Sequence, residues 1–172
     1  KPLTHSILEA RQFALEAEKN KDIKQMAYQS HAGEPIRRAV ELIRSGVIGK
    51  VKEVHAWTNR PIWPQGLKDK LPAQEIPKNM NWDQWIGPAP MRAYNPGYAP
   101  FKWRGWWDFG TGALGDMGCH IMDMPFWALD LKYPSAVEAK QNGNSLECGP
   151  NKSIVTYTFP EGKYSHKMPY VW

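Results

Sequence analysis

An acid and an imidazole stand one helical turn apart in residues 110–123, which read GTGALGDMGCHIMD. Asp116 precedes His120 by four positions and Asp123 follows it by three, so a helix would present all three side chains on one face. An imidazole can accept a hydroxyl proton at neutral pH, and a nearby carboxylate can orient the ring or the substrate. The glycines of the segment let another molecule approach the backbone closely. The spacing therefore predicts the floor of an active site.

The same residue types allow two other interpretations. An acid and a histidine on one helix are often a solvated or hydrogen-bonded pair without catalytic function. Asp116, Cys119, His120 and Asp123 are also possible metal ligands, but Cys119 would lie about 100° around the helix from His120. No second cluster of cysteine and histidine supports a zinc site, so we expect no metal. With two cysteines in the chain, Cys119 and Cys148 are expected to be buried thiols.

Gly110, Gly112 and Gly115 satisfy the dinucleotide-binding pattern G-x-G-x-x-G. That pattern functions only where a buried, β-branched strand leads directly into the first glycine. Residues 104–109 read RGWWDF, which is not such a strand. We therefore predict that the match is accidental.

Composition excludes some partners and favours others. The net charge of +5 arises from 22 basic and 17 acidic residues, and the basic ones are scattered, so we expect no nucleic-acid partner. The sequence has no apolar run of membrane-spanning length, and we expect no membrane partner. Nine tryptophans favour a carbohydrate-like ligand, because aromatic faces stack on the C–H faces of sugars.

The first thirty residues are expected to form one helix and one strand. Ser6 and Glu9 match the capping-box pattern, which predicts a helix beginning there. Its inner face is predicted from apolar residues at helical spacing: Ile7, Ala10, Ala14 and Ala17. Residues 23–28 (IKQMAY) read as a short strand, so this stretch resembles the closing helix and strand of an α/β sheet.

A second helix is expected from Pro35 to Gly46, because proline favours the first turn and glycine the C-terminal cap. Its predicted inner face consists of Ile36, Ala39, Val40 and Ile43. Residues 51–59 then alternate as a strand with Val54 and Ala56 on one face. The opposite face holds His55, Trp57 and Asn59, and either lines a site or lies at an interface.

Residues 60–109 are expected to form a long irregular insert that holds eight of the fifteen prolines and six of the nine tryptophans. Within it, residues 81–87 (NWDQWIG) should make one helical turn. The insert leads into the acid and imidazole segment and is expected to pack over it as a wall or lid. Later strands are expected at residues 136–140, 153–159 and 164–172, and their short links favour antiparallel pairing.

Several of these segments resemble one enzyme family. Lys1-Pro2 is similar to the end of the Glu-Lys-Pro motif of the Gfo/Idh/MocA oxidoreductases, the relatives of glucose-fructose oxidoreductase and inositol dehydrogenase. Residues 115–123 are similar to the Asp-x-x-x-His motif of that family. Residues 33–57, 81–90 and 103–112 resemble a tryptophan-rich branch of it.

The resemblance implies a Rossmann domain that binds NAD or NADP, followed by a domain on a mostly antiparallel sheet that binds substrate and makes oligomer contacts. The expected fold class is α+β. Residues 1–31 would be the last helix and strand of the Rossmann domain, and residues 32–172 an incomplete substrate-binding and oligomerisation domain. A homo-oligomer formed through the C-terminal sheet is expected. Without most of the dinucleotide-binding half, these 172 residues alone are expected to be inactive.

The resemblance also implies roles for individual residues. Lys1 matches the lysine that touches nicotinamide and substrate, Asp116 the acid that binds the reacting hydroxyl, and His120 the general acid and base. Cofactor contacts are expected from Lys1, Pro2 and Arg104. Substrate contacts are expected from residues at strand ends or in the insert: Gln29, His31, Trp57, Asn59 and Tyr94. Asp123 is expected to pair or cap within the domain rather than to act in catalysis.

The favoured function is an NAD(P)-dependent oxidoreductase that oxidises a secondary hydroxyl of a sugar, cyclitol or glycoside, with His120 as general base. One alternative is a glycoside lyase or hydrolase that acts through transient 3-keto oxidation and recycles its NAD. Another is a non-catalytic sugar-binding or assembly protein with the same fold. The location is left open between cytoplasm and periplasm, the latter because exported relatives exist in this branch.

Overall fold

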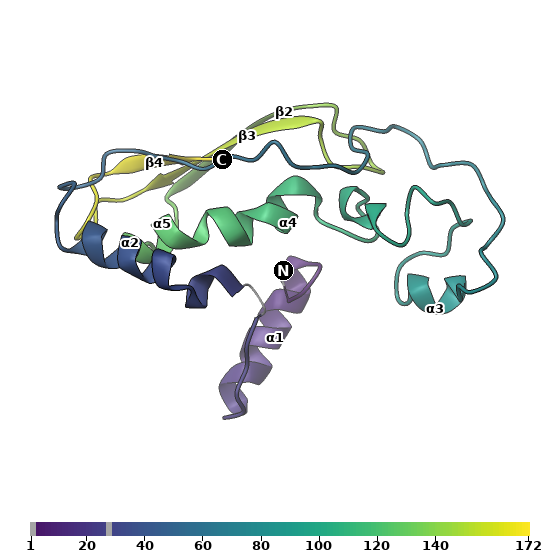
Figure 1. Ribbon diagram of the computed structural model, residues 1–172, viewed down its shortest axis with the longest axis horizontal. Coiled ribbons are helices and arrows are strands. Elements are labelled where there is room, and N and C mark those ends of the chain that lie inside the picture. Colours follow the sequence, from purple (N-terminus) through teal and green to yellow (C-terminus); the bar gives the residue numbers. More distant parts are fainter. Residues whose placement is uncertain (1–2, 27–28) are drawn as a thin grey trace. The chain divides into compact units, whose positions relative to one another are not determined.

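The computed structural model describes residues 3–26 and 29–172 (Figure 1). By its contacts the chain divides into two compact units. Unit 1 comprises residues 1–57, 117–138 and 155–172, and unit 2 comprises residues 58–116 and 139–154. The described helices and strands are, in chain order, α1 (Ile7–Lys19), η1 (Gln29–Ala32), α2 (Glu34–Arg44), β1 (Val54–His55), α3 (Trp82–Ile86), η2 (Lys102–Gly105), α4 (Gly112–Ile121), α5 (Asp123–Ala128), β2 (Ala136–Asn142), β3 (Lys152–Phe159) and β4 (Met168–Val171).

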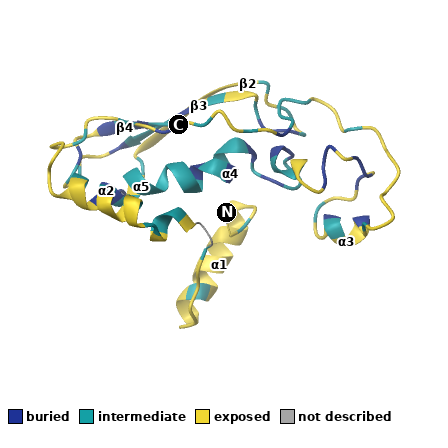
Figure 2. Ribbon diagram, in the orientation of Figure 1, coloured by how far each residue is buried: buried dark blue, intermediate teal, exposed yellow. Residues whose placement is uncertain are grey.

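Helix α1 begins with the predicted capping box. The Ser6 hydroxyl accepts a hydrogen bond from the Glu9 backbone N–H at 3.2 Å, and the Glu9 carboxylate accepts from the backbone N–H of Ser6 at 3.2 Å. The predicted inner face is wrong for this structure, since none of the described residues up to position 26 is buried and Ile7 is 91% exposed (Figure 2). Helix α1 is therefore held by local hydrogen bonds rather than by packing.

The strand predicted at residues 23–28 is also wrong for its described part. Residues 23–26 have no strand pairing, and Ile23 is 99% exposed. A strand exists only where a neighbouring strand satisfies its N–H and C=O groups, and no described segment pairs with these residues. Positions 27 and 28 lie outside the described residues.

Acid is expected to release the N-terminal turn of α1. Two backbone N–H groups, of His5 and Ser6, donate to the Glu9 carboxylate and hold its pKa below the ordinary value of 4.5. A lowered pKa means that the stabilisation is present above pH 4.5 and is lost as the pH falls through the lowered value. Amide-exchange protection of the first turn of α1, corrected for intrinsic exchange, should therefore decline in this acid range.

Two variants test that this decline comes from Glu9. Glu9→Gln keeps the acceptor oxygen without a titrating group, so its protection should no longer depend on pH there. Glu18→Gln, on the same exposed helix, should titrate like the wild type. An acid response that persists in Glu9→Gln would contradict the assignment.

The second helix and the faces of the following strand follow the predictions. Helix α2 has Pro35 in its first turn, and Gly46 follows it with a positive φ of 84°. Val40 is buried, and its neighbours on the same face, Ile36, Ala39 and Ile43, are partly buried. Ala56 is buried next to the short strand β1, whereas Trp57 is 75% exposed, as the alternation predicts.

Unit 1 is built in layers on the sheet (Figure 1). The sheet order is β1-β4-β3-β2, with β1 parallel to β4 and β3 antiparallel to β4. Helix α5 packs against the sheet, since the Tyr170 hydroxyl donates to the Met122 carbonyl at 2.9 Å and Phe126 lies edge-on to Phe159 at 6.2 Å. Helix α2 packs on α5 in turn. Burial raises the pKa of the Tyr170 hydroxyl, so it remains protonated as a donor.

Unit 2 contains the insert, which is irregular apart from α3 and η2, as predicted. The predicted turn at residues 81–87 is α3, whose Asn81 side chain accepts from the Gln84 N–H at 3.0 Å. The core of this unit is aromatic, and Trp82 stacks on Trp85 at 4.9 Å. Its buried members are Trp82, Ile86, Tyr94, Tyr98, Ala99, Trp106 and Cys148. Packing of aromatic rings therefore stabilises this proline-rich, irregular insert.

The α+β class is confirmed by this mixture of helices with a small mixed sheet. The boundary at residues 31 and 32 and the assembly through the sheet remain predictions. Among the described helices, none has the length and apolar character that a membrane crossing requires.

Candidate active site

Helix α4 carries both Asp116 and His120, so the predicted one-turn spacing is present in the structure. Asp116 is 6% exposed and His120 is half-buried. The boundary between the two units falls inside α4, which assigns Asp116 to unit 2 and His120 to unit 1. Asp123 is not in α4 but opens α5. The helix is interrupted because Pro125 has no N–H to donate to the carbonyl of Ile121.

In unit 2 the Asp116 carboxylate is paired with Arg104, whose Nε lies 3.3 Å from Oδ1. The guanidinium also donates to the Phe101 carbonyl at 2.9 Å and lies over the ring of Trp103 at 4.4 Å. A buried carboxylate requires such a counter-charge, and stacking on the ring fixes the cation in place. Arg104 is therefore a partner of the predicted substrate-binding acid, and its contact with cofactor phosphate remains a prediction.

The glycine pattern does not form a dinucleotide-binding loop. The chain before Gly110 is the short helix η2 and a turn rather than a strand, as predicted. A Cβ on Gly110 would lie 2.5 Å from the Arg104 carbonyl, and one on Gly115 would collide with the Thr111 side chain. These glycines allow close packing of the chain on itself, so this loop does not fit a dinucleotide.

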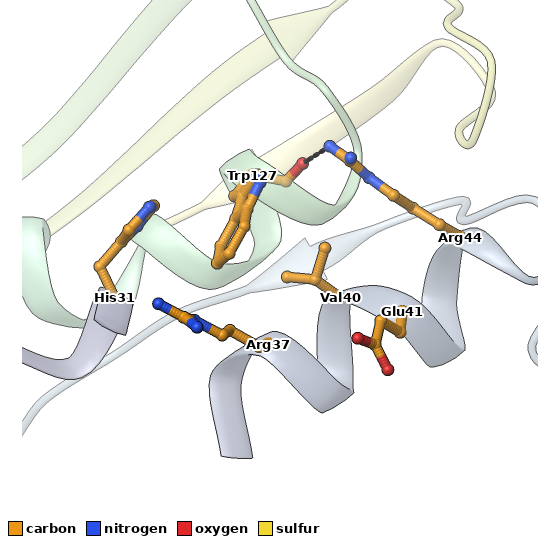
Figure 3. Close-up of a pocket in the computed structure, with 6 residues that line it drawn as sticks. All are labelled: His31, Arg37, Val40, Glu41, Arg44 and Trp127. Atoms are coloured by element: carbon orange, nitrogen blue, oxygen red, sulfur yellow. Dashed lines mark hydrogen bonds between the residues drawn. The ribbon is translucent and has the colours of Figure 1, made fainter. Parts of the chain in front are cut away.

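In unit 1 the predicted substrate residue His31 lies against Asp123 and Trp127 (Figure 3). The Asp123 Oδ2 accepts a hydrogen bond from His31 Nδ1 at 2.8 Å, so Asp123 is paired inside unit 1, although His31 belongs to the other side of the predicted boundary at residues 31 and 32. The imidazole stacks on the Trp127 indole with ring centroids 4.3 Å apart and planes 20° apart. The carboxylate fixes the orientation of the ring, and the stack covers one face of the indole.

The other predicted site residues are scattered. Gln29 is exposed in η1, and Trp57 and Asn59 are exposed next to β1. Tyr94 is 7% exposed and lies edge-on to Trp82 at 5.2 Å, so it belongs to the aromatic core of unit 2. Lys1 and Pro2 lie outside the described residues.

Sequence reasoning missed Trp127 and Arg37, which lie close to His31. In the sequence, Trp127 is one of nine tryptophans, and no motif distinguishes it from the others. Arg37 stands in a helix with four other charged residues, and nothing in the sequence distinguishes it from them. No signal short of tertiary structure identifies either residue.

The two cysteines differ in burial. Cys148 is fully buried, and burial raises the pKa of its thiol to about 11, so it is not a nucleophile at neutral pH. Cys119 is partly buried in α4. Across residues 3–26 and 29–172, no three metal-binding side chains are grouped.

The described residues thus combine a mixed sheet covered by helices with an acid and an imidazole one turn apart on α4. The family model described as oxidoreductase family, C-terminal alpha/beta domain, matches residues 31–164. That match covers well over half of the chain, and the chain belongs to the Gfo/Idh/MocA oxidoreductase family. No curated protein sequence matches the chain significantly.

Proposed function

We propose that this chain forms the substrate side of an NAD(P)-dependent oxidoreductase that oxidises a secondary hydroxyl of a sugar, cyclitol or glycoside. The observation that supports this most directly is the pair Asp116 and His120 on α4 in a chain of this family. Proton transfer from the hydroxyl is the part of the oxidation that these side chains can perform.

In this mechanism an imidazole nitrogen of His120 accepts the hydroxyl proton as the C–H bond breaks. General base catalysis of this kind accelerates a reaction by about 10²–10⁴-fold. Asp116 accepts a hydrogen bond from the substrate and orients it, while Arg104 balances the charge of the buried carboxylate. Lys1, whose predicted role is to stabilise the developing alkoxide, lies outside the described residues.

Members of this family generally use NAD(P), which would accept the hydride. The loop at residues 110–115 does not form a dinucleotide-binding site. The described side chains supply proton transfer, orientation of the substrate and charge balance.

A stoichiometric assay tests the proposal. The complete enzyme with NAD⁺ or NADP⁺ should form one keto product for each nicotinamide reduced, when offered sugars, cyclitols and aryl glycosides. Omission of the nucleotide should abolish product. Release of an aglycone without net reduced nicotinamide would replace the proposal with the glycoside-cleaving alternative. Calorimetric glycan binding that is independent of nucleotide, without any turnover, would replace it with a binding protein.

A further inference from the structure

Unit 1 contains an open hollow of about 440 Å³ that is lined by residues of η1, α2 and α5. It is lined by His31, Arg37, Val40, Glu41, Arg44 and Trp127 (Figure 3). Two arginines, an indole and an aliphatic side chain thus share one concave surface. Which of its charges are already neutralised decides what the hollow can bind.

Arg44 is used as a structural contact. Its Nη2 donates to the Trp127 carbonyl at 2.5 Å and its Nε to the Ala128 carbonyl at 3.2 Å. Both carbonyls are in the last turn of α5, where acceptors lack partners within the helix and a cation is favourable. Arg44 therefore joins α2 to α5 and fixes one wall of the hollow.

Glu41 is also engaged, because its carboxylate pairs with Arg38 at 3.1 Å on the exposed side of α2. Arg37 differs from both. It lines the hollow, and across residues 3–26 and 29–172 no carboxylate forms an ion pair with it. An arginine guanidinium offers a planar fork of donors that matches carboxylate and phosphate oxygens.

The opposite wall is aromatic and fixed. Asp123 holds the His31 ring at 2.8 Å, and that ring stacks on Trp127. Figure 3 shows Arg37 extending from α2 toward His31 and Trp127. A cation beside an indole and Val40 suits a ligand that joins an oxyanion to a carbon skeleton.

We propose that this hollow is a subsite for the anionic group, a carboxylate or a phosphate, of an acidic sugar substrate, with Arg37 as the residue that binds it. The inference rests on the proposed function and specifies its substrate class. The wall formed by His31 and Trp127 is fixed by α5, the helix that directly follows α4 and the proposed general base His120 in the chain.

Calorimetry on the complete protein at neutral pH tests the subsite with glucuronate, glucose 6-phosphate, glucose and inorganic phosphate. At least one acidic sugar should bind about tenfold more tightly than glucose, and Arg37→Gln should remove that advantage, since a charge-assisted hydrogen bond is worth about tenfold or more. Glu41→Gln should strengthen binding of the acidic sugar by roughly twofold, because it removes the negative charge from the lining. Arg11→Gln, which removes one exposed charge from α1, is the matched control and should change nothing.

These measurements distinguish a carboxylate from a phosphate ligand, and they test the subsite separately from the proposed oxidoreductase function. Preference for glucuronate or for glucose 6-phosphate identifies the group as carboxylate or phosphate. An Arg37→Gln loss that appears with NAD⁺ but with neither acidic sugar would overturn the inference, as would equal losses in Arg37→Gln and Arg11→Gln. Efficient oxidation of neutral sugars that is unchanged in Arg37→Gln would contradict the subsite and support the proposed function. Binding of an acidic sugar that depends on Arg37, without nicotinamide reduction, would support the subsite and contradict the oxidoreductase assignment.

Discussion

Replacing His120 with alanine in the complete enzyme is expected to lower kcat for nicotinamide reduction by about 10²–10⁴-fold, the usual contribution of a general base. Without the imidazole, the hydroxyl proton has to leave to water while the C–H bond breaks. Nicotinamide nucleotide affinity should be unchanged, because the proposed role of His120 on α4 is proton transfer rather than nucleotide binding. The measurement is steady-state reduction at 340 nm together with calorimetry of nucleotide binding.

Two controls make this result specific to His120. His166→Ala removes an exposed imidazole of unit 1 and should retain turnover. Imidazole added to the medium should partly restore activity to His120→Ala, because a small base can occupy the vacated space. Turnover of His120→Ala close to that of the wild type would remove this residue from the mechanism and leave Asp116 without a catalytic partner.

Local signals in the sequence predicted the helices well, because each has its determinants within a few residues. The pair Ser6 and Glu9 defines the start of α1, and Asn81 caps α3. In α2 the apolar spacing predicted an inner face that includes Val40, the buried residue of this helix. Each of these signals consists of residues at most four positions apart in the sequence.

The strands predicted at residues 136–140 and 153–159 correspond to β2 and β3, and β4 lies within the predicted range 164–172. The two strands predicted earlier in the chain were less accurate, because a strand depends on a partner that the local sequence does not specify. Residues 51–59 alternate as predicted in burial, but β1 pairs with β4 only at Val54 and His55. Residues 23–26, which were also predicted as part of a strand, have no pairing at all. Strand propensity describes how a side chain fits a pleated surface and does not show that a neighbouring strand is present.

The same distinction applies to the candidate site. The spacing of Asp116 and His120 is readable because both stand on one helix. The contact of His31 with Asp123 joins residues 92 positions apart, and no periodicity reports such a pair. Tyr94 shows the opposite error, since an aromatic residue in an insert fits ligand binding and core packing equally well until burial is known. Sequence therefore predicted which residues share an element and not which elements meet.

Replacing Arg92 with methionine is expected to lower the free energy of unfolding of unit 2 by about 3–5 kcal/mol, the usual effect of breaking a buried ion pair. Arg92 is 9% exposed, contacts the Asp108 carboxylate directly and lies 3.1 Å from that of Glu147. Burial acts to lower the pKa of the guanidinium, but the charge of Asp108, a hydrogen bond with Tyr98 and the charge of Glu147 together raise it. Methionine would fill similar volume and leave two carboxylates without their cation.

Urea unfolding followed by tryptophan fluorescence measures this loss, since the rings around Arg92 belong to the aromatic core. Arg60→Met is the matched control: Arg60 is exposed and only lies over Trp63 at 6.0 Å, so it should cost less than about 0.5 kcal/mol. If uncompensated charge is the cause, replacing Asp108 and Glu147 as well with apolar residues of similar size should recover most of the stability. Recovery would show that the carboxylates are destabilising once Arg92 is gone. A triple variant as unstable as Arg92→Met would instead mean that the guanidinium stabilises unit 2 through its packing on Tyr98 and Phe109, 5.1 and 5.2 Å away.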